Sequence, residues 1–303
     1  MNTYYAYLIE TLTNTHVGIG AEQVGIVDNL IQRDPVTRIP VFYSSSLKGA
    51  LRDHLTTRKN GAITDNLISG IFGKEYDQAA KTKDERKTSP GNVIFFEARL
   101  LTLPLRSTRK VFYHCTCRAV LKDYCSALLQ FFPGEKSDLE EIIKWLNNLS
   151  EIKNFIVFDD ADIQKLEIED YQHQADEVKT LSKELSKIFD RFLKVPQSNL
   201  ALFNDDIFRS ICDNGMPVIA RNKLDEKGES ENLFYDEILP RRSVLWFVLG
   251  LMDKIYQYDY EKFEATILDT NIVQFGGNYT IGYGFSKIER LTPQRAQEET
   301  HES

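Results

Sequence analysis

Three stretches of the chain carry residue types that suit the binding or cleavage of a phosphodiester, and the first is IPVFYSSSLKGALR at residues 39–52. Three serines precede apolar residues at helical spacing, and Lys48 and Arg52 lie about one helical turn apart. A helix start presents free backbone N–H groups to anions, and lysine and arginine contact phosphate without reading sequence. The stretch therefore suits a phosphodiester backbone, although a plain capped helix with solvated charges explains the same residues.

The second stretch, FGGNYTIGYGF at residues 275–285, is rich in glycine. Glycine permits backbone conformations and close approaches that side chains forbid, and Tyr279, Tyr283 and Phe285 are interleaved with the glycines. The spacing is that of neither a Walker loop nor a dinucleotide fingerprint. Two interpretations remain open, a cradle for RNA and a tight β-turn with core aromatics.

The third stretch, HVGIGAEQVGIVDNLIQRDP at residues 16–35, holds His16 and Asp28 in one glycine-marked loop. RNA can be cleaved through its own 2'-hydroxyl if a protein holds the attacking oxygen in line, moves protons and offsets charge. A histidine and a carboxylate suit that chemistry. The alternative is a turn-capping aspartate and a structural histidine, and the residue types alone do not select Asp28.

Composition limits the class of protein. The chain has 303 residues, of which 42% are hydrophobic, and a net charge of -8. This length and hydrophobic content are enough to bury a full core. The excess of acidic residues counts mildly against a nucleic-acid-binding protein. The four cysteines form no C-x-x-C pair, so we expect reduced core thiols. No long uncharged apolar run and no signal-peptide order is present, so we expect a soluble cytoplasmic protein without a membrane partner.

The elements that must position these stretches form an α+β pattern. Strand-like runs occupy residues 3–12, flank Arg106, and recur as RSVLWFVLG, whereas residues 74–91 read as a polar loop. Helical spacing occurs in SSSLKGALRDHL and over residues 118–131, 138–148 and 175–193, with a short strand possible at 155–158. Residues 216–240 have the pattern of a long hairpin. Two β-α-β passages separated by an insertion suggest a ferredoxin-like core.

Taken in order, the stretches resemble one family. IPVFYSSSLKGALR is similar to the serine-lysine-glycine helix start of RAMP superfamily proteins, and VQFGGNYTIGYGF to their C-terminal glycine-rich loop. Between them, IFGKE, VIFFEARLLTLPLRSTRKVFYHCTCRAVLKDY and ARNKLDEKGESENLFYDEILPRRSVLWF resemble blocks of the Cmr-type backbone subunit. GIVDNLIQRD resembles that family's loop with the acidic residue implicated in target cleavage. The sequence departs from the pattern at Glu97, where Asp is commoner, at Asn278, where an acidic residue is usual, and loosely over 160–200.

The resemblance implies one elaborated RAMP domain over residues 1–303 with the shape of a right hand. Its fold class would be α+β, with a ferredoxin-like (RRM-like) palm, helical fingers and a β-hairpin thumb. The implied boundaries are about 1–135 and 240–290 for the palm, 136–213 for the helical insertion, 214–240 for the thumb and 291–303 for a flexible tail.

The function that the resemblance implies is that of a backbone subunit in a type III-B CRISPR ribonucleoprotein. Copies would stack head to tail along a CRISPR guide RNA, beside other Cmr complex subunits, and cleave complementary target RNA at regular intervals as an endoribonuclease. A divalent metal ion, Mg or Mn, would assist cleavage without being bound tightly. Base pairing would supply specificity, so an acidic chain with a basic groove would suffice.

The resemblance also implies roles for single residues. The guide phosphates would be held by Ser45, Ser46, Lys48 and Arg52, in a groove shaped by Gly276, Gly277 and Tyr283. Asp28 would bind the metal ion or orient the 2'-hydroxyl, with His16, Asp236 and Glu237 as candidates for proton transfer.

Three alternatives stay open. A Csm-type backbone subunit shares the fold, the stacking and the acidic residue. A non-catalytic RNA-binding structural subunit would lack a functional Asp28. A stand-alone guide-processing endoribonuclease would depend on His16 and would cleave repeat RNA without partners.

Overall fold

The computed structural model describes residues 3–20, 27–59, 61–74, 88–158, 166–172, 181–224, 230–269 and 271–291. Most of the predicted polar loop, the first part of the predicted 175–193 helix and the tail from residue 292 lie outside these ranges. Among the described helices, none is both long and apolar enough to cross a membrane.

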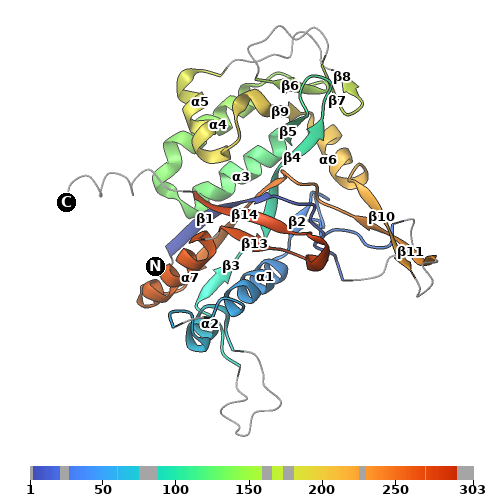
Figure 1. Cartoon of the computed structure of the whole chain (residues 1–303). Coiled ribbons are helices and arrows are strands. Elements are labelled where there is room, and N and C mark those ends of the chain that lie inside the picture. Colours follow the sequence, from blue (N-terminus) through green and yellow to red (C-terminus); the bar gives the residue numbers. More distant parts are fainter. Residues whose placement is uncertain are drawn as a thin grey trace.

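One large mixed sheet runs through the molecule (Figure 1). Its strands are β1 (Thr3–Thr11), β2 (Val41–Phe42), β3 (Val93–Phe95), β4 (Ala98–Arg106), β5 (Phe112–Cys117), β6 (Phe155–Val157), β9 (Leu200–Phe203), β12 (Val244–Leu251), β13 (Ile272–Gln274) and β14 (Phe285–Leu291). Their spatial order is β13-β14-β1-β12-β4-β5-β9-β6, with β2 paired to β4 and β3 to β12. All pairings are antiparallel except β5 with β9, which is parallel.

Strand β12 is the centre of the sheet, and all eight of its residues are buried. A strand covered on both faces reads as a continuous apolar run, which explains why VLWFVLGL lacks polar alternation. On one face the ring of Phe247 stacks on Tyr7 of β1, with ring centroids 5.0 Å apart. On the other face Trp246 packs against Tyr124. Both faces of the sheet therefore need helical cover.

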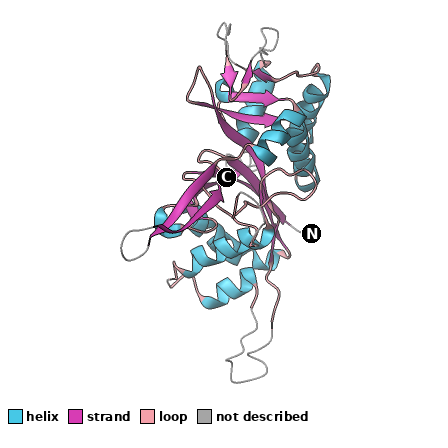
Figure 2. Cartoon of the chain, turned by 90° about the vertical axis from the view of Figure 1, so that its right-hand side faces the viewer, coloured by secondary structure: helices cyan, strands magenta, loops and turns pink. Residues whose placement is uncertain are grey.

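Two groups of helices supply that cover (Figure 2). On the Phe247 face lie α1 (Ser44–Thr56), α2 (Asp65–Phe72) and α7 (Gln257–Asp269), which contact one another. The Tyr7 hydroxyl hydrogen-bonds the Tyr260 hydroxyl of α7 at 2.6 Å, which fixes α7 to this face. On the Trp246 face lies α3 (Arg118–Phe131), which carries Tyr124 and packs against α4 (Lys136–Asn148). The helices predicted over 118–131 and 138–148 are thus confirmed.

The middle of the chain is less helical than the sequence pattern predicts. Besides α4, α5 (Lys183–Leu193) and α6 (Asp205–Asn214), it contains the predicted short strand β6, the small pair β7 (Glu167–Ile168) and β8 (Tyr171–Gln172), and β9. Strand β9 is a run of four buried residues that lies parallel to β5. A run of four apolar residues is too short to show a periodicity. Only the pairing with β5 identifies β9 as a strand.

The predicted hairpin consists of β10 (Val218–Leu224) and β11 (Ser230–Glu237), paired antiparallel, and it extends away from the body of the molecule (Figures 1 and 2). It forms a separate two-stranded sheet. The four cysteines are all free and buried, as expected for core thiols.

Candidate functional site

Residues 27–31, called the Asp28 loop below, are attached to the base of the hairpin. The backbone N–H groups of Asp28 and Asn29 both donate to the Tyr235 carbonyl, at 3.1 and 3.2 Å. In return the Tyr235 N–H donates to Asp28 Oδ2 at 2.7 Å, and the Glu237 N–H to the Asn29 carbonyl at 2.9 Å. The Asp28 loop therefore lies along β11 like an added parallel strand.

The Asp28 side chain is exposed at this junction. One carboxylate oxygen, Oδ2, is held by the hairpin backbone. The other, Oδ1, has no hydrogen-bond partner in the part of the chain that the structure describes. An aspartate fixed through one oxygen and open at the other can still bind a cation or accept a hydrogen bond from a hydroxyl.

His16 is attached to the same base. Its Nδ1 lies 2.7 Å from the Glu237 carbonyl oxygen. Because a carbonyl only accepts, Nδ1 carries the hydrogen, and Nε2 of the neutral ring is left as an acceptor. Next to it, Thr15 and Leu239 exchange backbone hydrogen bonds at 2.9 and 2.8 Å. His16 and Asp28 are thus both joined to the stretch that runs from Tyr235 to Leu239.

Asp236 and Glu237 also lie at the base of the hairpin, but both side chains are buried. Asp236 is 2% exposed and accepts from Arg221 Nη1 at 2.8 Å and from Asn29 Nδ2 at 2.7 Å. Burial acts to raise the pKa of Asp236, but the hydrogen bonds from Arg221 and Asn29 outweigh it and lower the pKa. Glu237, 5% exposed, forms a two-pronged ion pair with Arg33, at 2.5 and 2.7 Å. These contacts favour a positioning role over the proton transfer that the resemblance implies.

Helix α1 begins at Ser44, so the predicted helix is confirmed, but its serines do not cap it. The N-cap residue is Tyr43, which makes no side-chain cap hydrogen bond. The helix starts one residue earlier than capping by Ser44 requires, and this places all three serines inside the first turn. Ser44 and Ser45 are exposed, and Ser46 Oγ accepts from Gln32 Nε2 at 2.8 Å.

The two predicted cations lie further along α1. Lys48 and Arg52 are each partly buried, and the spacing of four residues places them on one flank of the helix. The Lys48 ammonium lies over the Phe95 ring, 5.8 Å from its centroid. The apolar face of the helix, with Leu47 and Leu51, is fully buried. Lys48 and Arg52 therefore lie on a flank of α1 beside the buried face, and Ser45 is exposed.

Gln32 connects α1 to the His16 segment, and nothing in the sequence distinguishes it. Its Oε1 accepts from the Tyr43 N–H at 2.7 Å, and its Nε2 donates to the Gly18 carbonyl at 3.0 Å as well as to Ser46. The side chain is 5% exposed. A glutamine in a polar loop gives no local signal of such a role.

The glycine-rich loop packs against His16. Gly276 has φ of 79°, and a Cβ there would lie 2.1 Å from the His16 carbonyl oxygen. The Gly277 N–H donates to the same oxygen at 3.0 Å. At the other end, Asn278 Oδ1 accepts from Arg221 Nη1 at 2.7 Å, which ties the loop to the hairpin. Tyr283 is partly buried in this loop.

The structure therefore joins Ser46, His16, the Asp28 loop and the glycine-rich loop through a chain of contacts, whereas Lys48 lies against Phe95 on the flank of α1. The start of α1 meets the His16 segment through Gln32, His16 meets the glycine-rich loop and Glu237, and the Asp28 loop meets β11. Arg33, Arg221, Asn29 and Gln32 complete this arrangement, and the sequence pattern does not identify their roles.

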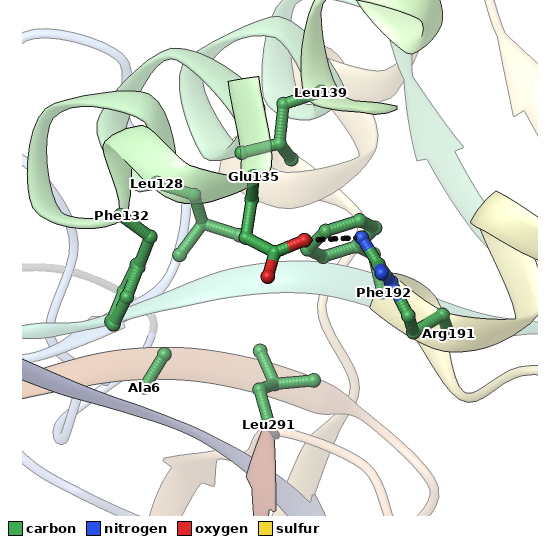
Figure 3. A pocket seen from close by; sticks show the side chains of 8 residues that line it. All are labelled: Ala6, Leu128, Phe132, Glu135, Leu139, Arg191, Phe192 and Leu291. Atoms are coloured by element: carbon green, nitrogen blue, oxygen red, sulfur yellow. Dashed lines mark hydrogen bonds and ion pairs between the residues drawn. The ribbon is translucent and has the colours of Figure 1, made fainter. Parts of the chain in front are cut away.

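A small pocket lies elsewhere, between α3, α4, α5 and strands β1 and β14 (Figure 3). Glu135 and Arg191 form an ion pair there at 2.6 Å, among Leu128, Phe132 and Leu139. The cavity is about 20 Å³, room for one water molecule. It has the size of a packing defect and is separate from the residues above.

Comparison with known proteins gives a consistent match in sequence. The model of the RAMP superfamily matches residues 8–287. The CRISPR system Cmr endoribonuclease Cmr4 of Pyrococcus furiosus is 26% identical over 291 residues, covering 93% of this chain and 95% of that protein. The CRISPR system Cms endoribonuclease Csm3 of Streptococcus thermophilus is 30% identical over 97 residues, covering 29% of this chain and 40% of that protein.

Solved structures share the fold. A chain of the type III-B Cmr-beta bound to cognate target RNA superimposes with a TM-score of 0.72 at 21% identity, covering 95% of this chain and 97% of that one. Oligomeric Cmr4 from Pyrococcus furiosus superimposes with a TM-score of 0.64 at 21% identity, covering 96% of this chain and 99% of that one. The likeness extends over nearly the whole length of each chain.

Proposed function

Because the chain belongs to the RAMP superfamily, we propose that it is a backbone subunit of a type III-B CRISPR ribonucleoprotein and cleaves target RNA within it. Copies bind head to tail along a guide RNA, together with other Cmr complex subunits, and each cuts the complementary target, so that cuts recur at the subunit spacing. The observation that carries the proposal is the exposed Asp28 carboxylate at the base of the hairpin, joined by contacts to α1 and the glycine-rich loop. The similar Cmr4 is named an endoribonuclease. Such a complex acts in the cytoplasm.

We also propose that part of the sheet is a ferredoxin-like palm. In chain order the elements β1, α1, β4, β12, α7 and β14 repeat a β-α-β pattern twice. In space the four strands lie side by side as β14-β1-β12-β4, all antiparallel, and α1 contacts α7 on one face. Residues of about 136–213 then form the fingers, and the hairpin β10–β11 forms the thumb.

The guide RNA lies along the start of α1 and the glycine-rich loop. Ser45 is exposed on α1, and Lys48 and Arg52 lie on one flank of the helix; their hydroxyl and cationic groups bind phosphate oxygens. Ser46 is held by Gln32 at the edge of this surface. The glycines at 276 and 277 let the loop approach closely, beside Tyr283. Base pairing supplies specificity, so the net charge of -8 is no obstacle.

Cleavage uses the target's own 2'-hydroxyl. Its oxygen attacks the adjacent phosphorus, the bond from phosphorus to the 5'-oxygen breaks, and a 2',3'-cyclic phosphate and a 5'-hydroxyl result. One proton leaves the 2'-hydroxyl and one reaches the 5'-oxygen. Asp28 Oδ1 orients the 2'-hydroxyl by accepting its hydrogen bond, and His16 accepts the proton at Nε2; the hydrogen bond of Nδ1 to the Glu237 carbonyl supports this role. Distortion of the target beside the hairpin supplies the in-line geometry.

A divalent ion, Mg or Mn, fits this site only if RNA supplies part of its coordination. Among the residues described, no group of three or more His, Cys, Asp or Glu side chains could hold a metal by itself. Magnesium is commonly bound by one or two carboxylates together with substrate phosphates. Asp28 Oδ1 would then hold the ion jointly with the target, in place of the hydrogen bond to the 2'-hydroxyl. When bound, the ion offsets charge on the phosphate.

The test is cleavage of labelled complementary RNA by the reconstituted complex with Asp28→Ala. We expect normal target binding and loss of the regularly spaced cuts. Asp34→Ala is the matched control, because Asp34 also accepts backbone N–H groups, from Val36 and Thr37, but lies in the next turn. If the cuts persist in Asp28→Ala, the chain is a non-catalytic structural subunit or depends on other residues.

A Csm-type subunit is the second candidate, favoured by the local match to Csm3. Assembly of the purified chain with Cmr partners but not with Csm partners decides between them. Cleavage of repeat RNA by the chain alone would instead indicate a stand-alone guide-processing enzyme.

A further inference from the structure

One arginine holds three separate segments together at the base of the hairpin. Arg221, on β10, donates from Nη1 both to Asp236 Oδ2 on β11 at 2.8 Å and to Asn278 Oδ1 in the glycine-rich loop at 2.7 Å. Its guanidinium also lies over the Phe234 ring, 5.1 Å from the centroid. These contacts fix both the direction and the plane of the guanidinium.

Asp236 passes this constraint to the Asp28 loop. While Oδ2 is held by Arg221, Oδ1 accepts from Asn29 Nδ2 at 2.7 Å. Asn29 is the residue next to Asp28, and its own backbone is bonded to Tyr235 and Glu237. With Asp236 2% exposed, loss of either partner leaves a buried carboxylate short of hydrogen bonds, so the arrangement strongly favours one geometry.

The Asp28 loop has little structure of its own. Its described backbone hydrogen bonds reach outward, to Tyr235 and Glu237 in β11, and to Ile19 in the His16 segment. The position of the Asp28 carboxylate therefore depends on how the loop is held against the hairpin.

We propose that Arg221 is a positioning residue for cleavage, acting through Asp236 to fix the Asp28 loop against the hairpin. Asn29 is the second member of this device, and Asn278 connects it to the glycine-rich loop that borders the guide. The inference rests on the proposed function, because a fixed position of Asp28 matters only if Asp28 takes part in cleavage. The hairpin and the Asp28 carboxylate then move as one unit when RNA binds. The carboxylate therefore keeps the same position relative to the hairpin and to the target bond that is cut beside it.

The experiment compares Arg221→Met, Asn29→Ala and Asp28→Ala in the reconstituted complex with guide RNA and labelled target. Single-turnover cleavage at saturating complex, the Kd for target and the melting temperature of the chain are measured for each. Arg191→Met is the matched control: its side chain is 23% exposed against 27% for Arg221, and it too pairs with a buried carboxylate, that of Glu135 in the pocket between α3, α4 and α5 (Figure 3).

We expect Arg221→Met and Asn29→Ala each to slow cleavage about tenfold or more, because small misplacements of a reacting group are costly. The Kd for target should stay within about twofold of wild type. Since both residues act through Asp236, the double variant should be little slower than the slower single variant. Arg191→Met should lower the melting temperature comparably and cut at the wild-type rate.

Two results would overturn the inference: wild-type cleavage by both variants, or slowing by Arg191→Met to the same extent, which would indicate general destabilisation. Arg221→Lys, which keeps the charge but cannot reproduce the planar contacts, covers the case in which Arg221→Met fails to fold, and it should also cut slowly. If Asp28→Ala alone stops cleavage while the others cut normally, only the positioning role fails. If Asp28→Ala cuts like wild type, the proposed catalytic function fails.

Discussion

Asp28 and Glu237, both at the base of the hairpin, illustrate how burial decides what a carboxylate can do. Asp28 is exposed and has an open oxygen, whereas Glu237 is enclosed with Arg33. A buried pair has lost its hydration, and the attraction within the pair compensates only while both members remain. Glu237 is therefore expected to stabilise the junction.

Glu237→Gln should lower the free energy of unfolding by about 3–5 kcal/mol, because it removes the close partner of the buried Arg33 charge and leaves only Asp213, at 4.0 Å. Urea denaturation measures this. Glu10→Gln serves as the control, since Glu10 pairs with Arg242 at the surface and such pairs contribute about 1 kcal/mol or less. Equal stability of the two variants would contradict a structural role for Glu237.

A second prediction at this scale concerns pH. Burial lowers the pKa of His114 to about 4, Glu10 opposes this shift and Arg242 adds to it. An unfolded histidine titrates near 6.5, so the folded state is fully stabilised above that pH and loses stability as the pH falls toward 4. Between about pH 7.5 and 5, the wild type should lose about 2 kcal/mol more than His114→Gln.

Urea denaturation at the two pH values checks the prediction, because the other titrating groups are common to both proteins. A wild-type slope equal to that of His114→Gln would mean that His114 is already accessible to protons in the folded state.

At the scale of elements, the glycine-rich loop shows that neighbouring glycines serve different purposes. Gly276 has positive φ and lies against the His16 carbonyl. At Gly277 a Cβ would meet nothing within 4 Å. The first glycine is needed by the fold, whereas the space beside the second is open to a ligand.

Gly276→Ala should therefore destabilise the loop and lower the melting temperature, because the new Cβ collides with backbone and the conformation is strained. Gly277→Ala should leave the melting temperature unchanged and weaken guide RNA binding if RNA occupies that space. Thermal melting and filter binding to guide RNA separate the two effects. Equal melting temperatures for both variants would contradict the assignment.

At the scale of the whole molecule, the proposed head-to-tail stacking makes every copy equivalent in contact with RNA. A heterologous interface of this kind extends until something limits it, and in the proposed assembly the guide RNA would set that limit. The solved oligomeric Cmr4 shares the fold of this chain. Cleavage should then be local to each subunit.

Complexes assembled from mixtures of wild type and Asp28→Ala should test this. Every cut should weaken in proportion to the fraction of variant, while the spacing between cuts stays constant, because each site depends on its own subunit. Gel analysis of end-labelled target measures both. Complete loss of all cuts at a small fraction of variant would contradict independent sites.

The sequence by itself determined the elements whose signal is local. The apolar run of β12, the helix over Arg118–Phe131 and the two arms of the hairpin follow from patterns within about ten residues, and the glycine and serine motifs indicated the family. It did not determine which residue begins α1, since the choice between Tyr43 and Ser44 as cap depends on how the preceding segment is held by Gln32.

Only the tertiary structure decided how the candidate site is built. Asp28 meets Tyr235 across 207 positions of sequence, and the partners of Asp236 come from the Asp28 loop and β10. Local patterns record which face of an element is buried, but the partner of a buried polar group is set by long-range packing. The exposure of Asp28 and the burial of Glu237 therefore emerge only when the hairpin folds against its loop.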